Sequence, residues 1–236
     1  TAPSDARGGQ ILADITKDRK IKSVAITYTN NDYGKGLADV YAAAVKAHGI
    51  KVTTTAAHED GKADYSAEVA TLASAGGDAV AVIGYLDQGG KGIIQGSLDS
   101  GAFDTFVLSD GMIGDSLTDT FGKDLNKSFG SLPGSTGKGA GIFAKVAKAA
   151  GIDSSGPYTS ESYDAAALIT LAMQAGGKAD RATIQKNVMS VANAPGKKIY
   201  PGELKKALDL LAKGKAINYE GATGVEFTEV GEAFGS

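Results

Sequence analysis

Four short apolar runs rich in β-branched residues recur at nearly constant spacing, and this spacing restricts the chain to a small set of folds. With Val24, Val52, Val80 and Phe106 as markers, the runs lie 28, 28 and 26 residues apart. A strand, a helix and two loops fill about 30 residues, the length of a βαβ unit. The runs are apolar without alternation, as is typical of parallel strands covered on both faces. Residues 21–110 are therefore predicted to form a doubly wound α/β layer.

Helical periodicity fills the intervals between these runs. Gly49 stands where a glycine commonly ends a helix, and a second helix is expected to begin after Asp64. A third, weaker helix is expected to end at Gly101. The clearest apolar stripe has helical spacing and consists of Leu37, Val40, Tyr41, Ala44 and Val45.

After the fourth run the pattern changes. Residues 127–137 are rich in Gly, Pro and Ser and are predicted to form a crossing or a loop, and residues 224–230 alternate like a strand. Charge divides as well, since residues 1–134 hold 12 basic and 17 acidic side chains and residues 135–236 hold 12 and 10. We therefore expect two lobes with a crossing near Pro133. Helices are expected over 138–150, 159–175, 180–191 and 202–213.

Composition excludes several classes of function. The chain has no Cys, which removes disulfides, thiolate catalysis and Cys–zinc sites. A net charge of −3 without a basic stripe argues against a nucleic-acid partner. No run of 18 apolar residues occurs, so no membrane-spanning helix is predicted. The two histidines are His48, at the end of a predicted helix, and His58, in a charged loop, and neither belongs to a hydrolase or metalloprotease motif. We expect no metal, no cofactor and no enzymatic activity.

Two glycine-rich stretches resemble nucleotide-binding loops but depart from them at decisive positions. In residues 90–96 the last glycine stands one place late for the dinucleotide fingerprint. In residues 134–139, Leu132 stands where a P-loop has its first glycine, and Gly139 replaces the hydroxyl that binds magnesium. A nucleotide-dependent α/β enzyme is therefore the least favoured alternative.

Polar and aromatic side chains follow three of the predicted strands. Tyr33 follows the first, Tyr85 the third, and Asp110 ends the fourth. Taken singly, each is better explained by a structural role, the tyrosines as packing residues and Asp110 as the cap of a turn. Because ligands of parallel α/β sheets bind beyond the carboxyl ends of the strands, the three together predict a pocket with two aromatic walls and one carboxylate. Such a pocket suits a cationic group on a small ligand.

Five segments of the chain resemble a known family. They are TAPSD, VAITYTNNDYGKGLAD, DYSAEVATLASAGGDAVAVIGY, FVLSDGM and SESYDAAALITLAMQAGG, and they are similar to the branched-chain amino-acid type of periplasmic solute-binding protein, the receptor component of ABC importers. The resemblance implies the type I periplasmic-binding-protein fold, with two α/β lobes closing on an amino acid. It implies that Tyr33 and Tyr85 are cleft aromatics of the second lobe and that Asp110 takes the ligand's ammonium. Tyr158 matches a cleft aromatic of the first lobe.

The resemblance also implies a division of this chain. Family members begin with a long segment that forms most of the first lobe, whereas TAPSD resembles the first crossing. Residues 1–134 would then be the second, ligand-binding α/β lobe, residues 135–216 helices of an incomplete first lobe, and residues 217–236 a crossing back to the second lobe. On this division we expect the 236-residue chain to bind free amino acids poorly. We also expect it to self-associate through the uncovered helix at 163–175.

The functional expectation is non-enzymatic, extracytoplasmic (periplasmic) binding of an amino acid or similar small zwitterion. Its partners would be that small molecule and the membrane permease of an ABC importer. A ligand-sensing regulatory domain on the same fold is the alternative. The sequence does not identify the ligand, because specificity depends on pocket walls from both lobes.

Overall fold

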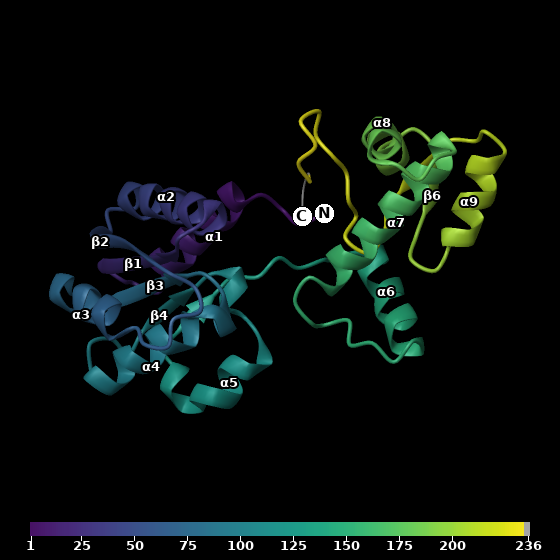
Figure 1. The fold of residues 1–236 in the computed structure, drawn as a ribbon. Helices are drawn as coiled ribbons and strands as arrows, with labels where there is room; N and C mark the ends of the chain where they lie inside the picture. The colour runs from purple at the N-terminus through teal and green to yellow at the C-terminus, as the bar shows by residue number, and fades with distance from the viewer. Residues whose placement is uncertain (234–236) are drawn as a thin grey trace. The chain divides into compact units, whose positions relative to one another are not determined.

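The computed structural model describes residues 1–233, and the chain forms two compact units, each with its own apolar core. One of them, the sheet unit, spans Asp5–Leu132. The other, the helical unit, comprises Thr1–Ser4 and the chain from Pro133 onward (Figure 1). The lobe boundaries expected from the sequence stay a prediction: 1–134, 135–216 and 217–236, of which 234–236 lie outside the described residues.

Five parallel strands form the sheet of the sheet unit, in the order β2-β1-β3-β4-β5. The parallel layer predicted for residues 21–110 is confirmed. The central strand β3 is buried along its whole length, which explains why its sequence is apolar without alternation. The strands are β1 (Ser23–Thr29), β2 (Lys51–His58), β3 (Ala79–Ile83), β4 (Phe106–Leu108) and β5 (Phe129–Gly130).

Helices cover both faces of this sheet, and alternate strand residues feed the two cores (Figure 1). Ile26 and Ala81 pack with α1 and α2, whereas Ala25 and Val82 pack with α3 and α4. The four helices are α1 (Asp5–Asp18), α2 (Asp32–Ala47), α3 (Ser66–Ala75) and α4 (Gly90–Ser100). Shorter segments follow β3 and β4, namely η1 (Leu86–Gln88), η2 (Asp110–Met112), α5 (Asp115–Phe121) and η3 (Gly122–Leu125).

Two elements of the sheet unit have little sequence signal. Helix α1 buries Gly9, Leu12, Ala13 and Thr16, so Leu12 is the one large apolar side chain among its buried positions. The hydroxyl of Thr16 lies 3.0 Å from that of Tyr41 on α2, a contact that apolar periodicity does not register. Strand β5 falls within residues 127–137, expected to be a crossing or a loop, and it is only two residues long, both of which pair with β4.

The helical unit contains the expected helices and a small parallel sheet. The helices are α6 (Lys138–Ala149), α7 (Thr159–Gly176), α8 (Arg181–Ala192) and α9 (Leu204–Ala212), each within about two residues of its predicted bounds. Strands β6 (Lys197–Ile199) and β7 (Ile217–Tyr219) pair with each other. Within residues 1–233, no helix has both the length and the apolar character needed to cross a bilayer.

The strand predicted for residues 224–230 is wrong. Among residues 1–233, its only strand-like pairing is an isolated antiparallel bridge between Phe227 and Ala233. The side-chain amide of Asn193 accepts from the N–H of Phe227 at 2.9 Å and donates to its carbonyl at 2.8 Å. Val225 is buried in the core of the helical unit. The alternating pattern therefore reflects the burial of an irregular segment. Its backbone forms hydrogen bonds with a side chain and not with a neighbouring strand.

A buried carboxylate organises the helical unit. Asp164 on α7 is fully buried. Its Oδ1 accepts from the hydroxyl of Tyr219 at 2.9 Å and from the N–H of Ala222 at 2.8 Å. Its Oδ2 accepts from the N–H and the hydroxyl of Thr223 at 2.8 and 2.7 Å. Charge-assisted bonds of this kind are about twice as strong as neutral ones, so Asp164 holds the turn after β7 against α7.

Replacing Asp164 by Ala is expected to lower the free energy of unfolding by about 2–4 kcal/mol, because each buried donor left without an acceptor costs about 1–3 kcal/mol. Asp209→Ala is the matched control, since the Asp209 carboxylate pairs with Lys205 in solvent and its loss should change stability little. Urea unfolding followed by far-ultraviolet circular dichroism measures both variants. Equal stabilities would contradict the structural role of Asp164.

Candidate functional site

The topology of the sheet brings three of the predicted site residues to one edge. Strands β1, β3 and β4 are neighbours in the sheet and run parallel, so their carboxyl ends lie together. Tyr33 stands in the first turn of α2, directly after β1. Tyr85 follows β3, and Asp110 opens the short helix after β4. The structure therefore juxtaposes these three residues, although their roles stay predictions.

The two tyrosines form a stacked pair. Their ring centroids lie 5.4 Å apart and their planes differ by 27°. Offset stacking at this distance is favourable by about 0.5–1.5 kcal/mol beyond the buried area. The side-chain amide of Asn31 caps α2 by accepting from the N–H of Gly34 at 2.9 Å, and its Nδ2 lies 3.5 Å from the hydroxyl of Tyr85. The cap thus sets the start of the helix that carries Tyr33.

The hydroxyl of Tyr33 joins the strand ends into one polar network. It donates to Oδ1 of Asp110 at 2.7 Å and lies 3.1 Å from Oγ of Ser109. It accepts from the N–H of Gly111 at 3.4 Å. The buried Ser109 Oγ in turn accepts from the N–H of Gly84 at 3.2 Å. Tyr33 therefore holds the Asp110 carboxylate in place and connects it to the turn that carries Tyr85.

The negative charge of Asp110 affects the pKa values of neighbouring groups at this edge. Burial raises the pKa of Tyr33 well above its ordinary value, and the nearby Asp110 carboxylate raises it further. The ring therefore stays a neutral phenol and a hydrogen-bond donor. Burial also raises the pKa of Asp5, with a further contribution from the charge of Asp110. Asp5, at the start of α1, is thus a second group whose pKa is raised by the charge of Asp110.

Sequence reasoning did not find three members of this network. Ser109 and Asn31 stand one and two residues from the predicted site residues, so proximity in sequence was the available signal. Asp5 lies 105 positions before Asp110 and has no signal of its own in the sequence. Its proximity follows from the packing of α1 on the sheet.

Tyr158 belongs to the helical unit. It stands immediately before α7 and has a left-handed backbone with φ of 58°, an uncommon conformation for a residue with a side chain. Its side chain is half-buried. Its role as a ligand contact stays a prediction.

The edge of the sheet unit is suited to holding a cation. A carboxylate fixed beside two stacked rings offers a charge-assisted hydrogen bond and a π face to an ammonium group. Among the described residues, no group of three or more His, Asp or Glu side chains is placed to hold a metal ion. Gly90, in one of the loops that resembled a nucleotide site, lies against the side chain of Met112, because a Cβ there would come within 2.2 Å of the sulfur. That glycine serves close packing.

Comparison with known proteins identifies the family. The model of a family described as periplasmic binding protein matches residues 1–200. This chain belongs to the periplasmic binding protein family. The resemblance stated from the sequence is thereby confirmed, and likeness to solved structures confirms the type I fold.

Relatives and solved structures extend along most of the chain. A chemotactic signal transduction system substrate-binding protein, BasB of Halobacterium salinarum, is 26% identical over 229 residues, which are 95% of this chain and 53% of BasB. An amino acid binding protein of Pseudomonas aeruginosa is 28% identical over 85% of this chain and 56% of that protein. The leucine binding protein LivK of Thermotoga maritima superposes with a TM-score of 0.73 at 19% identity, covering 97% of this chain and 60% of LivK. The chain spans about half the length of the curated relatives it matches.

Tyr33→Phe is expected to leave the number of tyrosines that ionise below about pH 11 unchanged. The reason is that burial and Asp110 keep the pKa of Tyr33 above this range. Phenolate absorbance during an alkaline titration measures that number. In urea, where the network is lost, the variant should ionise one phenol fewer than the parent chain. A deficit of one phenol already in the folded protein would contradict the buried network.

Proposed function

We propose that this chain takes part in the non-enzymatic binding of an amino acid or similar small zwitterion outside the cytoplasm, for uptake by an ABC importer. The observation that carries the proposal is the Asp110 carboxylate, which Tyr33 holds at 2.7 Å beside the stacked Tyr33–Tyr85 pair. This arrangement matches what an α-ammonium group requires, namely a fixed negative charge and aromatic faces.

The family supports this proposal at a coarser level. Its members are substrate-binding proteins, and the matched relatives include proteins named for amino acids or for leucine, isoleucine and valine. A membrane permease is the partner that an importer would require. Tyr158 is proposed as a further ligand contact on the resemblance alone, and self-association of the chain stays a prediction.

In the intact gene product, Asp110→Asn is expected to weaken binding of L-leucine, L-isoleucine or L-valine far more than Asp110→Glu does. The Asn variant leaves a desolvated ammonium without its charged partner, at a cost of about 2–5 kcal/mol. That cost corresponds to a Kd at least about thirtyfold higher. Titration calorimetry measures the change.

The control for this experiment is Asp115→Asn. Asp115 is exposed at the start of α5 and lies near Asp110 in sequence, so its replacement should leave the affinity unaltered. Unchanged affinity in Asp110→Asn would exclude Asp110 as the ammonium partner. Failure of the parent protein to bind any amino acid would reject the proposed function itself.

A sensing role is the second candidate, and one observation favours it. BasB, which matches 95% of this chain, is named as a component of a chemotactic signal transduction system. Deletion of the gene distinguishes the two roles. Loss of uptake of a labelled amino acid with chemotaxis intact supports the importer, and the opposite result supports the sensor.

A further inference from the structure

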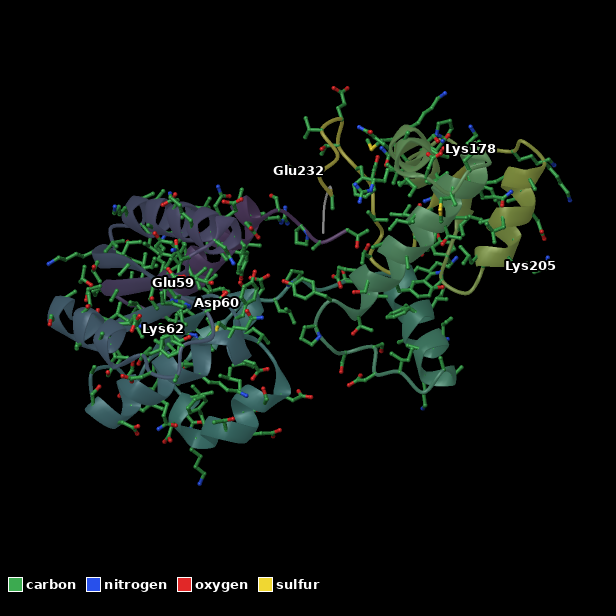
Figure 2. The ribbon with its side chains drawn as sticks, viewed as in Figure 1. Glu59, Asp60, Lys62, Lys178, Lys205 and Glu232 are labelled. Atoms are coloured by element: carbon green, nitrogen blue, oxygen red, sulfur yellow. The ribbon has the colours of Figure 1, made fainter. Side chains whose placement is uncertain are left out.

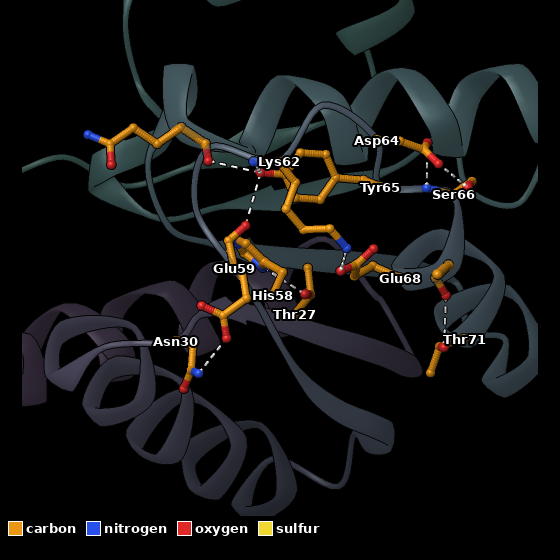
Figure 3. Close-up of polar contacts among 12 residues, drawn as sticks. Thr27, Asn30, His58, Glu59, Lys62, Asp64, Tyr65, Ser66, Glu68 and Thr71 are labelled. Carbon is orange, nitrogen blue, oxygen red and sulfur yellow. Dashed lines mark hydrogen bonds and ion pairs between the residues drawn. The ribbon is translucent and has the colours of Figure 1, made fainter.

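His58, the last residue of β2, is buried next to Gly84, which precedes Tyr85 of the candidate site. The sequence predicted His58 in a charged loop, but β2 continues to pair with β1 as far as His58 itself, which is only 1% exposed. Its Nδ1 lies 2.9 Å from Oγ1 of Thr27 (Figure 3). Its Nε2 is buried and has no hydrogen-bond partner among the described residues. The ring of Tyr65 packs against the imidazole edge-on, with centroids 6.2 Å apart.

The imidazole supports the turn that carries Tyr85. A Cβ built on Gly84 would lie 3.1 Å from Nε2 of His58, so the ring stands directly against the backbone of Gly84. The N–H of Gly84 donates to Ser109, which contacts the hydroxyl of Tyr33. Movement of the imidazole toward Gly84 would therefore displace Tyr85 and disturb the network around Tyr33.

The segment that begins with His58 also supports the turn before Tyr33. The carbonyl of His58 accepts from the N–H of Asn30 at 2.9 Å. Glu59 accepts from the side-chain amide of Asn30 at 2.6 Å, as Figure 3 shows. Asp60 accepts from the hydroxyl of Thr29 at 2.6 Å. Glu59 and Asp60 follow β2 directly in the chain, and Figure 2 labels both on the sheet unit. Both loops that carry site tyrosines are thus attached to the end of β2.

We propose that His58 is a positioning residue for the Tyr33–Tyr85 pair and that protonation of its imidazole loosens the pair. In the neutral tautomer that carries its proton on Nδ1, the imidazole donates to Oγ1 of Thr27, and only the Nε2 lone pair is left without a partner. A protonated imidazole carries a second N–H at Nε2, which faces Gly84 and meets no acceptor there. An unpaired buried donor is costly, so the charged ring favours an arrangement in which the Gly84 turn has moved.

The surrounding groups define the pH range. Burial lowers the pKa of His58 below its ordinary value of 6.5, while the carboxylates of Asp60, Glu68 and Glu59 oppose the shift. Lys62 pairs with Glu68, and Tyr65 is the other titratable group against the ring. Because the pKa is lowered in the native arrangement, the tyrosine pair is fully supported above about pH 6.5. That support is lost as the pH falls through the lowered pKa.

The test combines histidine NMR with tyrosine circular dichroism. The chain has two histidines and no Trp, so the ring proton of His58 is assigned with a His48→Gln variant, and near-ultraviolet dichroism reports tyrosines. His48 lies on the surface with its Nε2 2.7 Å from Asp14. We expect the tyrosine signal to change with the midpoint of His58 while the far-ultraviolet spectrum stays constant. Tyr85→Leu should remove the change, and His58→Phe should make the profile flat.

A binding measurement extends this test and rests on the proposed function. The Kd for L-leucine should rise as the pH falls from 7.5 to 5.5. The size of the rise depends on how much the pKa of His58 differs between the native arrangement and the one in which the Gly84 turn has moved. Each pKa unit of that difference raises the Kd by up to about tenfold. If no amino acid binds, the proposed function is rejected. The NMR and dichroism measurements still test the role of His58 independently.

Three outcomes would overturn the positioning role. The first is a tyrosine signal that stays constant while His58 titrates. The second is a pH-dependent signal that persists in Tyr85→Leu or in His58→Phe, which would assign it to Tyr65 or to a carboxyl group such as Asp5. The third is titration of His58 only together with loss of the far-ultraviolet spectrum, which would mean global unfolding.

Discussion

Burial of a parallel sheet on both faces is the constraint on which the sheet unit depends. Parallel strands are joined only by crossovers, and each crossover helix must return over one face of the sheet. The segments that leave β1, β3 and β4 therefore emerge at a common edge. For this reason Tyr33 and Asp110, 77 residues apart in the chain, come within hydrogen-bond distance. The polar network at the edge is a product of topology before it is a product of any local motif.

The fold of residues 21–110 could be predicted because burial on both faces imposes an apolar composition on β1, β3 and β4, while β-branched residues mark the edge strand β2. Alternating burial is a misleading sign of a strand where burial has another cause. Residues 224–230 alternate because Val225 and Phe227 pack inward, yet Asn193 satisfies the backbone of Phe227. Helix α1 was not predicted, and three of its four buried residues, Gly9, Ala13 and Thr16, are small or polar, with Leu12 the exception.

Only those residues of the candidate site that directly follow a predicted strand could be predicted from the sequence. Tyr33, Tyr85 and Asp110 follow strands that the sequence indicates, and the structure brings them together. The proximity of Asp5 to Asp110 depends on the packing of α1, a helix that the sequence analysis did not predict. His58 depends on how far β2 extends, because a strand that ended at residue 55 would have left it in solvent. Neither fact is encoded in a local pattern.

The hydrogen bond between Tyr33 and Asp110 has a consequence for the thermodynamics of the proposed ligand binding. Both side chains are restrained before any ligand arrives, because the ring stacks on Tyr85 and its hydroxyl is shared with Asp110. Immobilising a side chain of this kind during association costs about 0.5–1.5 kcal/mol. Here that conformational entropy is lost during folding. If the proposed ligand binds at this edge, a substitution that freed the rings without removing them would reduce its affinity through an entropic penalty while the contacts themselves remained in place.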